Sequence, residues 1–213
     1  MSRQVPARRI EEDASSTLSD RLTRAVLDIA GRIPATDEHA TRSPDDRVRA
    51  IAAAAANKAA LAAGTLALPP GPLGWLTIVP ELAAIWQIQR QMVADIAGVY
   101  GVSAGLTRSH MLYCLFRHAA AQAVRDIGVQ VGARLLVQDL PLQIIERIAG
   151  KIGMSLSKRL LGRGIARWLP FIGALGVGAY AYYDTGQVAR TAIALFSGEE
   201  VATSRRLRVR DRA

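Results

Sequence analysis

The most apolar part of the chain lies between residues 59 and 101, and prolines and glycines interrupt it. No charged residue occurs between Lys58 and Glu81, a run of 22 residues. That length could cross a membrane, but Pro69, Pro70 and Pro72 exclude one regular helix through 66–79. We therefore predict a helical hairpin with an apolar tip. The tip residues expected to insert into lipid or to pack are Leu66, Leu68, Leu73, Trp75, Leu76 and Ile78.

Apolar residues recur at helical spacing on both sides of this hairpin. The pattern over 18–33 predicts a short amphipathic helix that Pro34 ends. After a polar linker, Ser43 is a suitable N-cap for an alanine-rich helix to about Ala63, which Gly64 can close. Pro80 is expected to start the next helix, which extends to about 101 and is weakened there by two glycines.

The rest of the chain continues the helical pattern. Thr107 or Ser109 is expected to start a helix to about residue 127, and two more, separated by Pro170, are predicted over 141–168 and 171–196. Residues 128–137 are ambiguous. No segment alternates apolar and polar residues, so we predict no strands and an all-α helical bundle with a glycine-rich apolar C-terminal helix.

Three regions are expected along the chain. Residues 1–42 form a polar N-terminal region with the short amphipathic helix, and 1–17 within it is charge-dense enough to be disordered. Residues 43–198 form the helical domain. Residues 199–213 form a basic tail that we expect to be disordered.

Charge and cysteine content indicate what kind of partner the protein attracts and in which compartment it occurs. The 213 residues carry a net charge of +9, and residues 111–170 alone contribute +6, from nine basic and three acidic residues. Such an excess attracts anionic partners. The one cysteine, Cys114, excludes an intramolecular disulfide and fits a reducing compartment. The N-terminal residues contain no apolar core of a signal peptide, so we expect none.

The clearest functional signal is a basic helix that ends near Trp168. Its cationic residues recur mostly at four-residue steps beside an apolar side, a pattern typical of helices on an anionic membrane surface. An ordinary solvated face, and binding to nucleic acid or an acidic protein, remain open alternatives. The residues predicted to bind anionic lipid are Arg147, Lys151, Lys158, Arg159, Arg163, Arg167 and Trp168.

Two motifs resemble catalytic or cofactor sites but lack the required context. Residues 101–105 read G-x-S-x-G, yet a helix precedes them, whereas a nucleophile elbow follows a strand. The last histidine, His118, comes too soon afterwards to complete a triad, so we predict a helix-breaking loop with a cap at Ser103. Gly173, Gly176 and Gly178 follow no strand and favour close helix packing over dinucleotide binding. We expect no catalytic residue and no cofactor.

Two other sets of polar residues occur in apolar surroundings. His110, Cys114 and His118 are spaced four apart, so they lie close to one helical face. No fourth ligand accompanies them, and we predict no metal site. Asp184 interrupts the C-terminal apolar helix; it is expected to pair inside the bundle, for example with an arginine, or to reach solvent.

Two stretches carry a resemblance to a known family. The alanine-rich helix and Gly/Pro turn lead into Val79-Pro80-Glu81-Leu82, and the following helix passes Met92 and closes on Ile96-Ala97-Gly98-Val99-Tyr100-Gly101. Trp168-Leu169-Pro170-Phe171-Ile172-Gly173-Ala174 leads into a small-residue helix. In these features residues 43–197 resemble the EcsC family of bacterial proteins. The run Gln89-Arg90-Gln91-Met92 is also similar to the helical domain of bacterial GTPases of the YcjF type.

The EcsC resemblance implies a non-enzymatic helical accessory protein with a membrane-protein or transporter partner. We therefore predict a peripheral protein on the cytoplasmic face of the cell membrane, where the basic helix meets anionic head groups. Phe171 and Ile172 would join the hairpin tip in lipid insertion or packing. The alternatives are a soluble scaffold that binds a protein and an integral protein with two short spans. Nucleic-acid binding is not expected, because aromatic residues are not interleaved with the basic ones.

Overall fold

The computed structural model describes the backbone of residues 5–66, 74–117, 141–162 and 170–198, and the side chains of 16–64, 79–117 apart from 81, 141–158 and 176–198. Over these ranges the chain is all-α and contains no strand, which confirms the predicted fold class. The elements are α1 (Val5–Gly31), α2 (Pro44–Leu66), α3 (Gly74–Val99), the short 3-10 turn η1 (Ser103–Gly105), α4 (Arg108–Phe116), α6 (Leu142–Gly162) and α7 (Pro170–Phe196).

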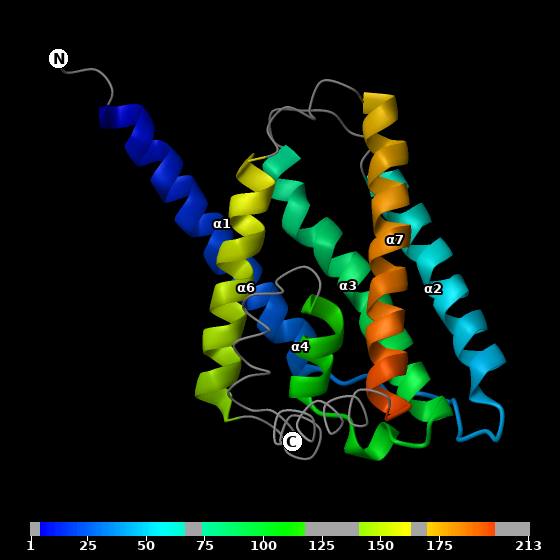
Figure 1. Cartoon of the computed structure of the whole chain (residues 1–213). Helices are drawn as coiled ribbons and strands as arrows, with labels where there is room; N and C mark the ends of the chain where they lie inside the picture. Colours follow the sequence, from blue (N-terminus) through cyan, green and yellow to red (C-terminus); the bar gives the residue numbers. More distant parts are fainter. Residues whose placement is uncertain (1–4, 67–73, 118–140, 163–169, 199–213) are drawn as a thin grey trace, which may run out of the picture.

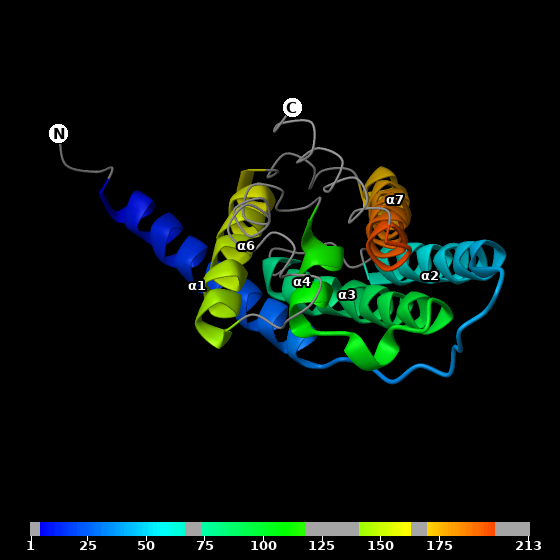
Figure 2. The ribbon, with the colours of Figure 1, turned by 60° about the horizontal axis from the view of Figure 1, so that its bottom comes forward.

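The helices form two layers (Figures 1 and 2). One layer contains α1, α3 and α2 in that order, and the other contains α6, α4 and α7. Helix α6 packs on α1, α7 packs on α2 and α3, and the short α4 lies over α1 and α3 and reaches α7. The core lies between the layers, where Trp86 of α3 meets Phe116 of α4 edge to face, with 5.1 Å between ring centroids.

Helix α1 is longer than predicted and belongs to the main core. Its apolar positions Leu18, Leu22, Val26 and Ile29 are buried in the same cluster as the apolar residues of α3, α4, α6 and α7. The expected disorder of 1–17 is wrong from Val5 onward, because the helix begins there. Residues 1–42 are therefore not a separate packing unit, since the stripe on α1 is needed to cover α6.

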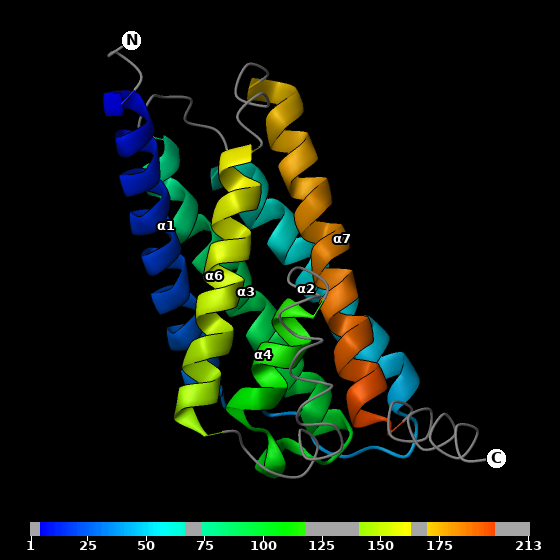
Figure 3. The same cartoon turned by 60° about the vertical axis from the view of Figure 1, so that its left-hand side comes forward.

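The predicted hairpin between α2 and α3 is present, but its turn is shorter than expected. The two helices pack against each other and run in opposite directions (Figure 3). Helix α2 continues past Gly64 to Leu66, and α3 begins at Gly74, so Pro80 lies inside α3 instead of starting it. Pro80 is the seventh residue of α3, beyond the first turn, so α3 lacks one backbone hydrogen bond there because proline has no N–H. Residues 67–73 lie outside the described range.

The end of α3 explains why two glycines occur there. Gly101 has a positive φ of 73°, and the bonds from Gly101 N to Gly98 O (2.9 Å) and from Val102 N to Ala97 O (2.9 Å) form a Schellman cap. A Cβ on Gly98 would lie 2.7 Å from the carbonyl oxygen of Glu38. Gly98 therefore allows the polar linker between α1 and α2 to cross α3, and Gly101 ends the helix.

That linker is fixed along α3 by hydrogen bonds. Thr36 Oγ1 donates to Asp95 Oδ1 at 2.7 Å, and Gln91 Nε2 donates to the carbonyl of Ala35 at 3.0 Å. At its far end Glu38 forms an ion pair with Arg47 of α2. The hydrogen bond from Arg47, assisted by its charge, lowers the pKa of the Glu38 carboxyl below its ordinary value.

The later helices agree with prediction where they are described. Thr107 is the N-cap of α4, and α7 covers the predicted 171–196 and includes Pro170. Helix α6 is described from Leu142 to Gly162, and the rest of the predicted 141–168 lies outside the described residues. The remainder of the helix predicted over 107–127, the ambiguous residues 128–137 and the tail 199–213 lie outside the described residues.

Candidate functional site

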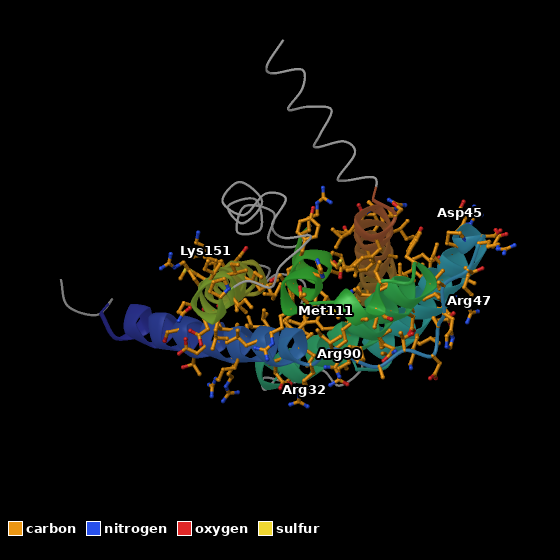
Figure 4. The ribbon with its side chains drawn as sticks, turned by 90° about the horizontal axis from the view of Figure 1, so that it is seen from below. Arg32, Asp45, Arg47, Arg90, Met111 and Lys151 are labelled. Atoms are coloured by element: carbon orange, nitrogen blue, oxygen red, sulfur yellow. The ribbon has the colours of Figure 1, made fainter. Side chains whose placement is uncertain are left out.

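The basic helix α6 presents a cationic stripe on the surface. Arg147, Lys151 and Lys158 are exposed, and the exposed Met154 lies between them at helical spacing. The side chain of Lys151 points away from the bundle (Figure 4). The side chains of Arg159, Arg163, Arg167 and Trp168 lie outside the described residues.

The apolar side of α6 is occupied by contacts within the protein. Ile145, Ile148 and Ile152 are buried in the main core cluster. Gly153 allows a close crossing with α1, because a Cβ there would lie 2.9 Å from both Ser19 O and Thr23 N. The described part of α6 therefore offers charge to a partner, whereas the apolar face that the amphipathic pattern offered to lipid is used to hold α1.

Helix α7 shows the opposite arrangement. Its first described turns contact α2 along a narrow seam, where a Cβ on Gly178 would lie 3.1 Å from the carbonyl oxygen of Ala60. Outside that seam the described part of α7 before Asp184 is exposed and uncharged, and its large exposed residues are Val177, Tyr180, Tyr182 and Tyr183. The sequence analysis missed these tyrosines. The cluster Tyr-Ala-Tyr-Tyr was a visible signal, but a helix that is apolar on all sides does not indicate which face is covered.

The apolar segments singled out by sequence meet at one end of the bundle. Helices α2 and α6 end there, and α3 and α7 begin there (Figures 1 and 3). The side chains of all the predicted insertion residues are outside the described set, and Leu68 and Leu73 lie outside the described residues altogether. The backbone of the others belongs to these helix ends: Leu66, Trp75, Leu76, Ile78, Phe171 and Ile172. On the neighbouring described surface, Leu61 of α2 is 71% exposed.

Asp184 pairs inside the bundle, and the partner described is a glutamine where an arginine was expected. Gln89 Nε2 donates to Asp184 Oδ2 at 2.8 Å and to Thr185 Oγ1 at 3.2 Å. Gln89 and Thr185 are fully buried between α3 and α7. Gln89 Oε1 finds no hydrogen-bond partner within the described part of the chain. This polar cluster holds α7 against α3 at one position, because buried polar groups are stable only where their hydrogen bonds are made.

The candidate metal ligands have other contacts. His110 Nδ1 accepts a hydrogen bond from Thr107 N at 3.2 Å, while Thr107 Oγ1 accepts one from His110 N at 3.3 Å. The His110 ring also meets Phe196 edge to face, and Cys114 is fully buried. His118 lies outside the described range. Within that range no group of three or more His, Cys, Asp or Glu side chains is placed to hold a metal ion.

The G-x-S-x-G sequence is not a nucleophile elbow. It follows helix α3 and forms the exposed turn η1, so Ser103 is not held at a strand-to-helix corner. The capping role predicted for Ser103 is also not found, because Thr107 caps α4.

Comparisons of the chain with protein-family models, curated proteins and solved structures found no match. The EcsC resemblance therefore stays a prediction based on its motifs. No helix within the described residues has the length and apolarity needed to cross a membrane.

Proposed function

We propose that the chain is a non-enzymatic, EcsC-like accessory protein that binds peripherally to an anionic membrane surface, on the cytoplasmic face of the cell membrane. The observation that carries this proposal is the exposed stripe of Arg147, Lys151 and Lys158 on α6. A basic residue close to an anionic leaflet contributes about 1 kcal/mol to binding, so three exposed residues supply a useful attraction if they reach the surface.

The uncharged exposed surface near the start of α7 supports the same proposal. Exposed valine, leucine and tyrosine side chains together with nearby cations match the two components of peripheral membrane binding, apolar insertion and head-group attraction. A membrane-protein or transporter partner would then meet the protein at the membrane. The EcsC resemblance is the only support for that partner.

Binding to lipid vesicles tests the proposal. We expect the protein to sediment with anionic vesicles more strongly than with neutral ones, and added salt should reverse the binding only in part. Changing Arg147, Lys151 and Lys158 together to Gln should weaken binding to anionic vesicles by about 100-fold where all three reach the lipid. A matched control removes three charges elsewhere, through Arg21, Arg42 and Arg49, which are exposed on α1, the linker and α2.

The control variant should bind almost as the unchanged protein does, because long-range charge is screened and only charges near the lipid count. Equal binding to anionic and neutral vesicles would refute the head-group role. Equal losses in the two triple variants would show that net charge alone, without a defined surface, drives the attraction. Changing Arg159, Arg163 and Arg167 together to Gln extends the same test to the predicted lipid-binding residues that follow Lys158 in the sequence.

A soluble scaffold that binds a protein is the second candidate. The observation in its favour is that the apolar face of α6 is covered by α1, so this helix needs no lipid to bury it. A scaffold would sediment with no vesicle, and its exposed tyrosine-bearing surface would meet a protein partner instead.

A further inference from the structure

Charged and uncharged surfaces change over within about 6 Å of height on two neighbouring helices. On α2 the last charged residue is the exposed Lys58, and on α7 the first is Asp184. The two helices run in opposite directions and meet where Ala60 faces Gly178 (Figure 1). Two residues from that contact, toward the charged side, lie Lys58 on one helix and Tyr180 on the other. At 1.5 Å per residue both are about 3 Å from the contact, and thus at nearly the same height.

The three tyrosines of α7 form a collar at this level. Tyr180, Tyr182 and Tyr183 are 50%, 49% and 62% exposed. They fall within about one helical turn, and the 100° step between residues points Tyr180 and Tyr182 about 200° apart. A helix lying flat on a surface would carry all three along one side at steps of three or four residues, whereas only Tyr180 and Tyr183 are spaced in this way and Tyr182 lies on another side. A ring at one height is the arrangement of a helix that passes through an interface end on.

We propose that the protein docks on the membrane by the end of the bundle where α7 begins, with the collar of Tyr180, Tyr182 and Tyr183 at head-group depth. This inference rests on the proposed function and names the surface and orientation that it uses. Tyrosine suits this depth because its ring is apolar and its hydroxyl stays in contact with water. Lys58 lies at the same level, where a long side chain reaches the head groups while its carbons stay in apolar surroundings.

The depth of insertion follows from helix geometry. Ten residues separate Pro170, where α7 begins, from Tyr180. That distance is about 15 Å, half of a hydrocarbon core of about 30 Å. The described part of α7 on the lipid side of the collar would therefore reach through one leaflet only.

End-on docking also predicts which basic residues of α6 contribute most to membrane binding. Helix α6 ends at Gly162 on the docked side, so Lys158 is near the membrane and Arg147 is eleven residues farther away. That separation is about 16 Å, twice the screening length of about 8 Å at physiological salt. Lys158 should therefore contribute most to binding and Arg147 least. A bundle lying with the α6 stripe flat on the membrane would use the two equally.

Site-specific fluorescent labels test the orientation. Single cysteines are introduced at Leu61→Cys and Val177→Cys near the docked end, at Met154→Cys within the α6 stripe, and at Arg190→Cys on the opposite part of α7. All four positions are exposed, whereas Cys114 is fully buried and should not react in the folded protein. Each labelled protein is mixed with anionic vesicles whose acyl chains carry bromine, which quenches only a dye that enters the lipid.

We expect quenching at residues 61 and 177 and none at 154 and 190. Quenching at 154 without 61 and 177 would overturn end-on docking and leave the proposed function standing. Sedimentation with vesicles but no quenching at any position would likewise overturn the collar and leave binding to charge alone. Failure to sediment with anionic vesicles would overturn the proposed function and this inference together.

A second measurement examines the collar and the charge ranking. Tyr182→Ser with Tyr183→Ser should weaken vesicle binding about fivefold, because two interfacial rings are lost. The matched variant with Phe at the two positions should retain most of the binding. Lys158→Gln should weaken binding more than Arg147→Gln. Equal effects of Ser and Phe, or of the two charge variants, would contradict the proposed orientation.

Discussion

The α1–α6 pair and the α2–α7 pair form the two sides of the bundle, and they are built from different side chains. Between α1 and α6 the buried residues are large aliphatics, among them Leu22, Val26 and Ile152. Between α2 and α7 they are small, and Ala59, Ala63 and Ala181 form a minor cluster of their own. Each pair also contains a glycine at its crossing, Gly153 in the first and Gly178 in the second.

This difference decides what each pair shows to its surroundings. The broad aliphatic contact uses up the apolar face of α6 and leaves only its charged face exposed. The alanine contact with α2 leaves part of the first described turns of α7 uncovered, so valine and tyrosine side chains remain on the surface. One pair thus supplies stability and positive charge, and the other supplies exposed apolar area, since small side chains bury less surface than large ones.

The largest expected effect comes from removing an aliphatic side chain of the first pair. Ile152→Ala should lower the free energy of unfolding by about 3 kcal/mol, because Ile152 is fully buried and a cavity would remain. Met154→Ala is the matched control on the same helix; it is 53% exposed and should change stability by less than about 0.5 kcal/mol. Urea unfolding measures the two variants, and similar small losses would show that α6 is not part of the cooperative core.

Alanine substitutions at the crossing glycines test how closely the helices approach each other in the α1–α6 and α2–α7 pairs. Gly153→Ala should cost about 2 kcal/mol, since its Cβ would meet backbone atoms of α1 at 2.9 Å. Gly178→Ala should cost less than about 1 kcal/mol, because its closest backbone neighbour, Ala60 O, is 3.1 Å away.

The same helices provide controls for these two variants. At Gly150 and Gly176 an added Cβ would have no neighbouring atom within 4 Å, so alanine there should stabilise the helix by about 0.5 kcal/mol. Thermal or urea unfolding of the four variants checks the order. A larger loss at Gly178 than at Gly153 would reverse the assignment of the tighter pair.

The smallest expected effect lies in the linker that joins the two pairs. Arg47→Gln should lower the melting temperature slightly at neutral pH, because it removes the partner of Glu38. The pKa of Glu38 is lowered in the folded state, so the pair stabilises the protein above the ordinary pKa of the carboxyl. That stabilisation is lost as the pH falls through the lower folded-state pKa. The difference between the two proteins should therefore vanish in acid, and a difference that grew in acid would contradict this sign.

The candidate surface was predictable only in part. The cationic stripe could be read from the spacing of Arg147, Lys151 and Lys158, because helical period and charge place them on one exposed face. What covers the apolar face of α6 could not be predicted from the sequence. An amphipathic pattern indicates that a face is covered but not whether protein or lipid covers it. The tyrosine collar was missed for a related reason: α7 is apolar on every side, so its periodicity selects no face.

The sequence by itself determined that the chain is helical, where most helices run, and where cations gather on α6. These properties depend on local propensity, caps and period, which neighbouring residues fix. The tertiary structure alone decided that α3 begins before Pro80, that Gly98 admits the linker, and that Asp184 meets Gln89. These features arise from contacts between residues far apart in the chain, and the energy of such contacts can override a local signal such as a helix-breaking proline.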